Sequence, residues 1–304
     1  MGPIQHPQLR DLIWAVSSPS LITPRRGWPR AFDYVPTAKT LYRLEHTDTQ
    51  LLDQHLARCE TRFLGSYFEA LWEFFFVHDP RFNVVAKNLQ IHDAHRTLGE
   101  FDFIVFDRQA NKHLHLELAV KFYLGVSETN THPYTDGENL WIGPQARDRL
   151  DIKIARVLGH QLTLHQQPLA QQQLRVLGVD TLEPQLLIKG YLFQPQTALP
   201  LPNYVRNTSE HAQWIGLEQL STVLNDQYPW HLLHKRHWLA PPYAENLNNP
   251  LSAGELGKQL SCIIKQENRP YLIAQSDGRT SSRQVLKRYF VTPCGWPHSL
   301  SYQS

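Results

Sequence analysis

The feature that most restricts the fold is a change of hydrophobic period between residues 64 and 193. The run LGSYFEALWEFFFVH, residues 64–78, repeats apolar side chains at helical spacing and ends before Asp79 and Pro80. Three extended runs follow at 82–91, 99–107 and 113–123, and the short link RQANK between the last two predicts a hairpin. A helix over 145–165, a Gln-rich turn and an apolar strand over 185–193 complete the series.

This order of helix, three strands, helix and strand excludes an all-helical or all-β domain. It predicts an α/β fold with a mixed central sheet flanked by helices. We expect a core over residues 61–195, an N-terminal helical extension over 1–60 and a C-terminal α+β extension over 196–304. The segment 194–202 contains three prolines and marks the second boundary. Four of the eight tryptophans follow it, which indicates that the C-terminal part is folded.

The composition restricts partners and location. The chain has 304 residues, with 30 Lys and Arg against 28 Asp and Glu, so any surface that binds nucleic acid must be local. The three cysteines are too few and too widely spaced for a disulfide framework or a zinc ribbon. No apolar run reaches the length of a membrane span. We therefore expect a cytoplasmic protein without a membrane partner, and the sequence does not determine the oligomeric state.

Two carboxylates on neighbouring expected strands are the best candidates for chemistry. Strand alternation in HLHLELAVKFY places Glu117 and Lys121 on one face. Asp102 is the only charge between Phe101 and Phe106, where an apolar setting would penalise it unless a cation or donor pairs with it. Mg²⁺ or Mn²⁺ would suit Asp102 and Glu117, because such hard cations take carboxylates, waters and phosphate oxygens. The plainer interpretation is an exposed strand face and a structural aspartate.

The same residues carry a resemblance. GEFDFIVF followed by LELAVKFYL resembles the Asp and Glu-x-Lys core of the PD-(D/E)XK nuclease superfamily, and the element order over 64–195 is similar to its common core. Along most of the chain, RDLIWAVSSPSL, LGSYFEALW, ELAVKFYLG, WIGPQARDRL and HWLAP resemble an uncharacterised bacterial domain-of-unknown-function family grouped with these nucleases. The resemblance implies a restriction-endonuclease-like core, metal binding by Asp102 and Glu117, and Glu69 as an accessory carboxylate.

The sequence departs from that motif at the lysine. The motif has lysine two residues after the glutamate, about 6.6 Å along the strand, but here that residue is Ala119. Lys121 lies about 13 Å along by strand rise. Three interpretations stay open. Lys121 leans back to within about 6 Å of the carboxylates, a lysine such as Lys87 or Lys153 replaces it, or the site is inactive.

A basic stripe on the expected helix 145–165 is the candidate nucleic-acid contact. Basic side chains recur every three to four residues, and Gln161 follows at the end; the candidates are Arg149, Lys153, Arg156 and His160. A solvated helix face is the alternative. The histidines form no recognisable zinc motif, so we expect none of them to bind zinc.

Together these features predict a Mg²⁺- or Mn²⁺-dependent nuclease, with DNA favoured over RNA. Asp102 and Glu117 would bind the metal, Lys121 would stabilise charge, and Glu69 would assist. The alternative is an inactive nuclease-fold module that binds nucleic acid or protein, which the alanine at position 119 favours.

Overall fold

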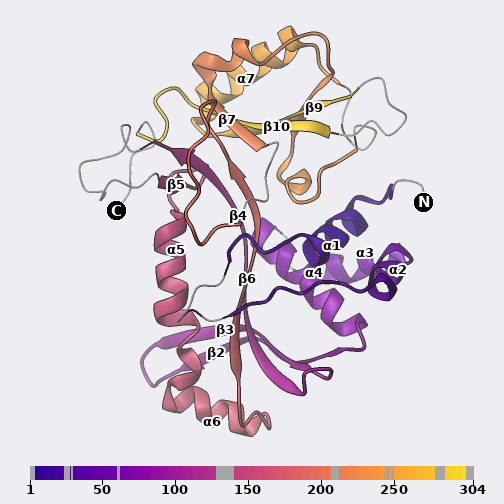
Figure 1. The fold of residues 1–304 in the computed structure, drawn as a ribbon, viewed down its shortest axis with the longest axis vertical. Coiled ribbons are helices and arrows are strands. Elements are labelled where there is room, and N and C mark those ends of the chain that lie inside the picture. The colour runs from indigo at the N-terminus through magenta and orange to yellow at the C-terminus, as the bar shows by residue number, and fades with distance from the viewer. Residues whose placement is uncertain are drawn as a thin grey trace.

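A larger mixed sheet with helices on both faces carries a smaller sheet at one end (Figure 1). The computed structural model describes residues 4–23, 28, 30–59, 62–127, 140–206, 212–243, 247, 250–277 and 285–298. None of the helices within these ranges has the length together with the apolar composition that a membrane-spanning helix requires.

The larger sheet has the order β1-β6-β4-β3-β2, and β5 pairs with the end of β4. Pairing is antiparallel from β2 through β3 to β4 and parallel from β4 through β6 to β1. This mixed pairing agrees with the expected α/β class. The strands are β1 (Arg30–Ala31), β2 (Phe82–His92), β3 (Thr97–Asp107), β4 (Lys112–Val126), β5 (Leu140–Ile142) and β6 (Glu183–Phe193).

Helices cover both faces of this sheet because β4 and β6 are apolar on both sides. Leu116 and Phe122 of β4 belong to the cluster that includes the buried face of α4, whereas Ala119 and Tyr123 pack with α5. The first face carries α1 (Pro7–Ser17) and α4 (Leu64–His78), with α2 (Ala38–Glu45) and α3 (Thr49–Arg58) beside them. The second carries α5 (Leu150–Arg156), the π-helical turn η2 (Val157–Gln161), the 3₁₀ turn η3 (Leu164–Gln166) and α6 (Pro168–Val176).

The smaller sheet has the order β7-β10-β9-β8, and α7 (Ala253–Glu267) packs on it. It is joined to the larger sheet by a bridge between Gln194 and Gln213 and by the ring contact of Phe193 with Phe290, whose centroids are 4.6 Å apart. One hydrophobic cluster therefore includes residues of both sheets. The strands are β7 (Ala212–Gly216), β8 (Trp230–Leu233), β9 (Tyr271–Ser276) and β10 (Val285–Thr292).

Two sequence predictions between β5 and β6 are wrong in detail. The helix expected over 145–165 is α5, which begins at Leu150, followed by the separate turns η2 and η3. The Gln-rich segment expected as a turn is α6, because Pro168 begins the helix and Ala170 and Leu174 are buried on one side. Most of the Gly-, Pro- and Thr-rich loop predicted before residue 144 lies outside the described residues.

Candidate active site

Asp102 and Glu117 lie where β3 and β4 stop pairing. The last pair of the antiparallel register is Phe103–Leu116, and Asp102 and Glu117 follow it on the two strands. Beyond this point the backbone N–H of Leu118 donates to Asp102 Oδ2 at 2.8 Å. The Asp102 side chain thus occupies a backbone donor that a continuing ladder would have used.

The alternation of side chains between the two faces of β3 is interrupted at Asp102. Phe101 and Phe103 would share a face in a regular strand, yet Phe101 packs in the cluster of α6 and Phe103 in the cluster of α4. Asn88, which lies opposite Asp102 in the β2–β3 register, has a φ of 49°. This local irregularity brings Asp102 to the opening between the strands.

Glu117 is buried and Asp102 is partly buried, and in both cases burial opposes ionisation. Glu117 is 2% exposed, and burial followed by the nearby charge of Asp102 raises its pKa to about 8. Burial also raises the pKa of Asp102 to about 7, although the hydrogen bond from Leu118 acts against this shift. Within the described part of the chain, Glu117 Oε2 is buried without a hydrogen-bond partner. The charge of Lys153 lowers the pKa of both acids, but it does not offset the effect of burial.

The cation nearest to Glu117 comes from α5. Lys153 Nζ lies 3.9 Å from Glu117 Oε1 and donates at 3.3 Å to Gln161 Oε1. Gln161 Nε2 donates in turn to Glu117 Oε1. The turn η2 positions Gln161 for this contact, because its wider coil follows directly after α5. Burial lowers the pKa of Lys153, and Glu117 is the largest opposing influence.

Lys121 lies elsewhere on the same strand face. Its ammonium donates to Asp148 Oδ2 at 2.6 Å, and the Tyr123 hydroxyl donates to the same oxygen at 3.3 Å. Ala119, in the usual position of the motif lysine, is buried against α5. The structure therefore brings Lys153 rather than Lys121 beside Glu117. Lys87, the other alternative, donates to Glu73 at 2.7 Å.

Two further acidic side chains affect the pair. Burial raises the pKa of Glu69 on α4, and the charge of Glu69 raises the pKa of both Asp102 and Glu117. Glu100 acts in the same direction on both, and the Gln90 amide donates to its carboxylate at 2.8 Å. Sequence reasoning missed Glu100 and Asp148. The alternation of Glu100 with Asp102 in GEFDF was the available signal for the first, and the quoted segment WIGPQARDRL contained the second.

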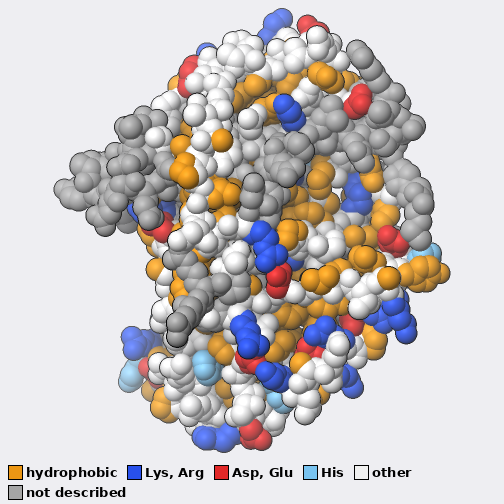
Figure 2. Space-filling view, viewed as in Figure 1, with side chains coloured by type: hydrophobic (Ala, Val, Ile, Leu, Met, Phe, Trp, Pro, Cys, Tyr) orange, Lys and Arg blue, Asp and Glu red, His pale blue; other side chains and the backbone are white. Residues whose placement is uncertain are grey.

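The expected basic stripe is divided in the structure. Arg149 pairs with Asp151 at 2.6 Å and Lys153 turns toward Glu117, whereas Arg156 and His160 are exposed. On the face shown in Figure 2, basic side chains lie in separate small groups among acidic ones. An exposed nucleic-acid contact on this helix would therefore depend on Arg156 and His160.

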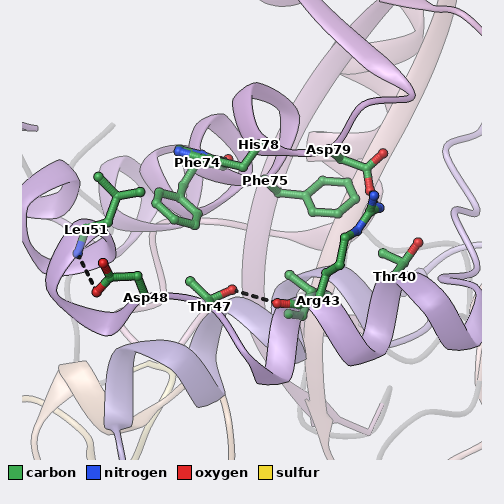
Figure 3. Close-up of a pocket in the computed structure, with 10 residues that line it drawn as sticks. Thr40, Arg43, Thr47, Asp48, Leu51, Phe74, Phe75, His78 and Asp79 are labelled. Atoms are coloured by element: carbon green, nitrogen blue, oxygen red, sulfur yellow. Dashed lines mark hydrogen bonds and ion pairs between the residues drawn. The ribbon is translucent and has the colours of Figure 1, made fainter.

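A separate cavity of about 180 Å³ lies between α2, α3 and α4 (Figure 3). Arg43 reaches across it to the buried Asp79 at 2.5 Å, and the ring of His78 stacks on Phe74 with centroids 4.1 Å apart. The cavity shares no lining residue with the carboxylate site. Its one arginine is paired with Asp79, and its other carboxylate, Asp48, accepts the backbone N–H groups of Gln50 and Leu51 at the start of α3.

In chemical terms, the carboxylate site contains two carboxylates of the type that Mg²⁺ and Mn²⁺ take as ligands, an ammonium beside one of them and a further carboxylate nearby. Comparison with known proteins gave no match to a curated protein and none to a solved structure. The profile of a domain of unknown function, DUF1853, matches residues 10–292. That match covers nearly the whole sequence, so the chain belongs to the DUF1853 family.

Proposed function

We propose that this protein is a divalent-metal-dependent nuclease that hydrolyses phosphodiester bonds, with DNA a better substrate than RNA. The observation that carries the proposal is the pair formed by the partly buried Asp102 and the buried Glu117. One Glu117 oxygen has no partner among the described groups, and the Lys153 ammonium lies 3.9 Å from the other. Raised pKa values of about 7 and about 8 mean that the ionised forms are disfavoured here, and a bound cation would favour them.

A divalent ion fits the donor set. Asp102 and Glu117 would hold it, and Glu69 could reach it through water, since Mg²⁺ commonly keeps several of its waters. When bound, the ion would polarise the scissile phosphate and lower the pKa of the attacking water. The positive charge of the ion would offset the repulsion between the two ionised carboxylates.

The side chains around the pair have separate tasks. Lys153 would place positive charge where the phosphate becomes more negative, as a lysine does in general in phosphoryl transfer. Gln161 donates to one oxygen of Glu117 and thereby fixes the direction of the carboxylate. Lys121 is held by Asp148 and would contribute mainly to the structure of this face.

The order of the core elements and the resemblance of the carboxylate motif support a restriction-endonuclease-like core. This support is an analogy of fold, and one fold can carry several different activities. In this interpretation the lysine has moved from the strand to α5: Ala119 takes the packing position, and Lys153 supplies the charge from the helix that packs on it.

The alternative is an inactive module that binds nucleic acid or protein. Ala119 and the pairing of Lys121 with Asp148 favour it, since the motif's own lysine position supplies no charge to the site. In that case binding would need no metal, and the buried acids would remain partly protonated.

The test compares cleavage of linear duplex DNA, single-stranded DNA and RNA by the full chain in Mn²⁺. We expect cleavage of DNA that EDTA stops and that Asp102→Ala and Glu117→Ala abolish. Lys153→Met should lower the rate by at least about hundredfold while Mn²⁺ binding persists, and the matched Lys121→Met should lower it far less.

Thermal unfolding and circular dichroism would establish that each variant folds. Equal cleavage by Asp102→Ala would overturn the site assignment. No cleavage with any metal, together with DNA binding that EDTA does not change, would replace the nuclease by the inactive module. A greater loss in Lys121→Met than in Lys153→Met would return the charge-stabilising role to the strand.

A further inference from the structure

Three potential metal ligands of different chemistry meet between α3 and α4. His55 lies on α3, Cys59 caps the end of that helix one turn later, and Glu73 lies on α4. Among the described residues, these are the only three His, Cys, Asp or Glu side chains whose ligand atoms all lie within 4.8 Å of one another. The cluster is distinct from the Asp102 and Glu117 site, and all three residues are partly buried.

The separations of the three ligand atoms match the edges of a zinc tetrahedron. Cys59 Sγ lies 3.8 Å from His55 Nε2 and 3.7 Å from Glu73 Oε2, and Nε2 lies 3.5 Å from Oε2. Zinc bonds of about 2.3 Å to sulfur, 2.05 Å to nitrogen and 2.1 Å to oxygen at tetrahedral angles give edges of about 3.6 Å, 3.6 Å and 3.4 Å. Each observed separation is within about 0.2 Å of that value.

We propose that His55, Cys59 and Glu73 bind a zinc ion that joins the end of α3 to the middle of α4. Thiolate and imidazole ligands select zinc over Mg²⁺ or Mn²⁺, which prefer oxygen. Three protein ligands leave the fourth position to water. The HxxxC spacing in QHLARC, which puts both ligands on one helix face, is the sequence signal for the site.

Two protein groups occupy these ligands in the metal-free structure. Lys87 Nζ donates to Glu73 Oε2 at 2.7 Å, and His55 Nε2 contacts the Ala70 carbonyl at 3.1 Å. Nε2 carries the proton that it shares with the Ala70 carbonyl, so zinc binding would break that hydrogen bond and move the proton to Nδ1, which frees the Nε2 lone pair for the metal. Zinc would also displace the ammonium from Oε2, and the thiol proton would leave to solvent. The lysine stem is long and flexible, so its head can withdraw without movement of the helix. Lys87 thus competes with the metal for one ligand atom.

The experiment uses Co²⁺ as a spectroscopic substitute for zinc in the full-length, metal-free protein. One equivalent of Co²⁺ should produce a thiolate-to-cobalt charge-transfer absorption, and Zn²⁺ should abolish it stoichiometrically. Cys59→Ser should remove the band, and His55→Ala and Glu73→Gln should each weaken binding by at least about tenfold. Lys87→Gln should tighten binding by about tenfold, since it removes the competing ammonium.

The controls use the other two thiols and the carboxylate site. Cys262→Ser and Cys294→Ser should retain the band, because both cysteines are exposed and lie outside the cluster. A variant with Asp102→Asn and Glu117→Gln should also retain it, so the result does not depend on the nuclease proposal. Absence of the band in the wild-type chain, or its persistence in Cys59→Ser, would overturn the proposal.

Discussion

Replacing Glu117 by glutamine should stabilise the metal-free protein at high pH and have little effect at low pH. The folded protein holds the Glu117 proton more tightly than the unfolded chain does, because burial and the neighbouring Asp102 raise the pKa from 4.5 to about 8. The contribution of the protonated acid to stability is therefore fully present below about pH 4.5 and is lost as the pH rises through about 8. Glutamine has no charge to bury.

The magnitude follows from the same values. A rise from 4.5 to about 8, at about 1.4 kcal/mol per pH unit, gives a ceiling of about 5 kcal/mol. Local relaxation around the charge reduces this, so we expect Glu117→Gln to raise the free energy of unfolding by about 2 kcal/mol near pH 9. Near pH 5 the difference should be within about 0.5 kcal/mol.

The assay is urea denaturation in EDTA from about pH 5 to pH 9. Glu218→Gln, at an exposed position, is the matched control and should show no such trend. Mn²⁺ should stabilise the wild-type protein most at high pH, where the carboxylates are ionised, and should stabilise Glu117→Gln less. An effect of Glu117→Gln that is the same at pH 5 and pH 9 would refute the electrostatic reasoning.

Three further changes test a buried histidine, a close backbone contact and a helix cap. His115 is fully buried, and among the described groups neither ring nitrogen has a hydrogen-bond partner; burial lowers its pKa to about 3. His115→Leu should therefore raise the free energy of unfolding by about 1 kcal/mol. The gain should be larger near pH 5, where the histidine of the unfolded chain is protonated, and unfolding curves at the two pH values would show it. Gly190→Ala should lower the free energy of unfolding by more than about 3 kcal/mol or prevent folding, because a Cβ at this position would lie 1.7 Å from the Lys121 carbonyl oxygen and the φ of Gly190 is 139°. Gly254→Ala is the matched control: its Cβ meets no atom within 4 Å, so it should be neutral or slightly stabilising. Thermal unfolding of the two variants measures the difference. Ser252→Ala removes the N-terminal cap of α7 and should lower the unfolding free energy by about 1 kcal/mol in urea, with an unchanged denaturant slope.

The sequence predicted the elements whose hydrophobic period is long and regular. The helix expected over 64–78 is α4 with the same bounds, and β2, β3, β4 and β6 each differ from their expected bounds by at most three residues, whereas the short strands β1 and β5 were not predicted. The elements α2 and α6 were missed. They are short and polar, so the packing of a few side chains stabilises them more than any periodic pattern does.

The site was predictable only as far as strand alternation extends. Alternation correctly placed Glu117 and Lys121 on one face, but their partners come from segments distant in the chain. The choice between Lys121 and Lys153 depends on how α5 crosses β4 and on where Asp148 lies, and neither is a local property of the sequence. The cluster of His55, Cys59 and Glu73 depends similarly on the packing of one helix against another.

The continuity of β6 with the smaller sheet affects how the protein can be divided. A fragment truncated after Phe193 would lose the ring of Phe290, and Tyr191 would lose the Leu239 carbonyl to which its hydroxyl donates at 2.9 Å. Asp11 of α1 would likewise lose the Ala240 N–H, 3.0 Å away. Such a truncation would expose apolar surface beside the strand that supports Glu117. Loss of activity in the fragment would therefore reflect unfolding, and point substitutions in the intact chain are the informative experiment.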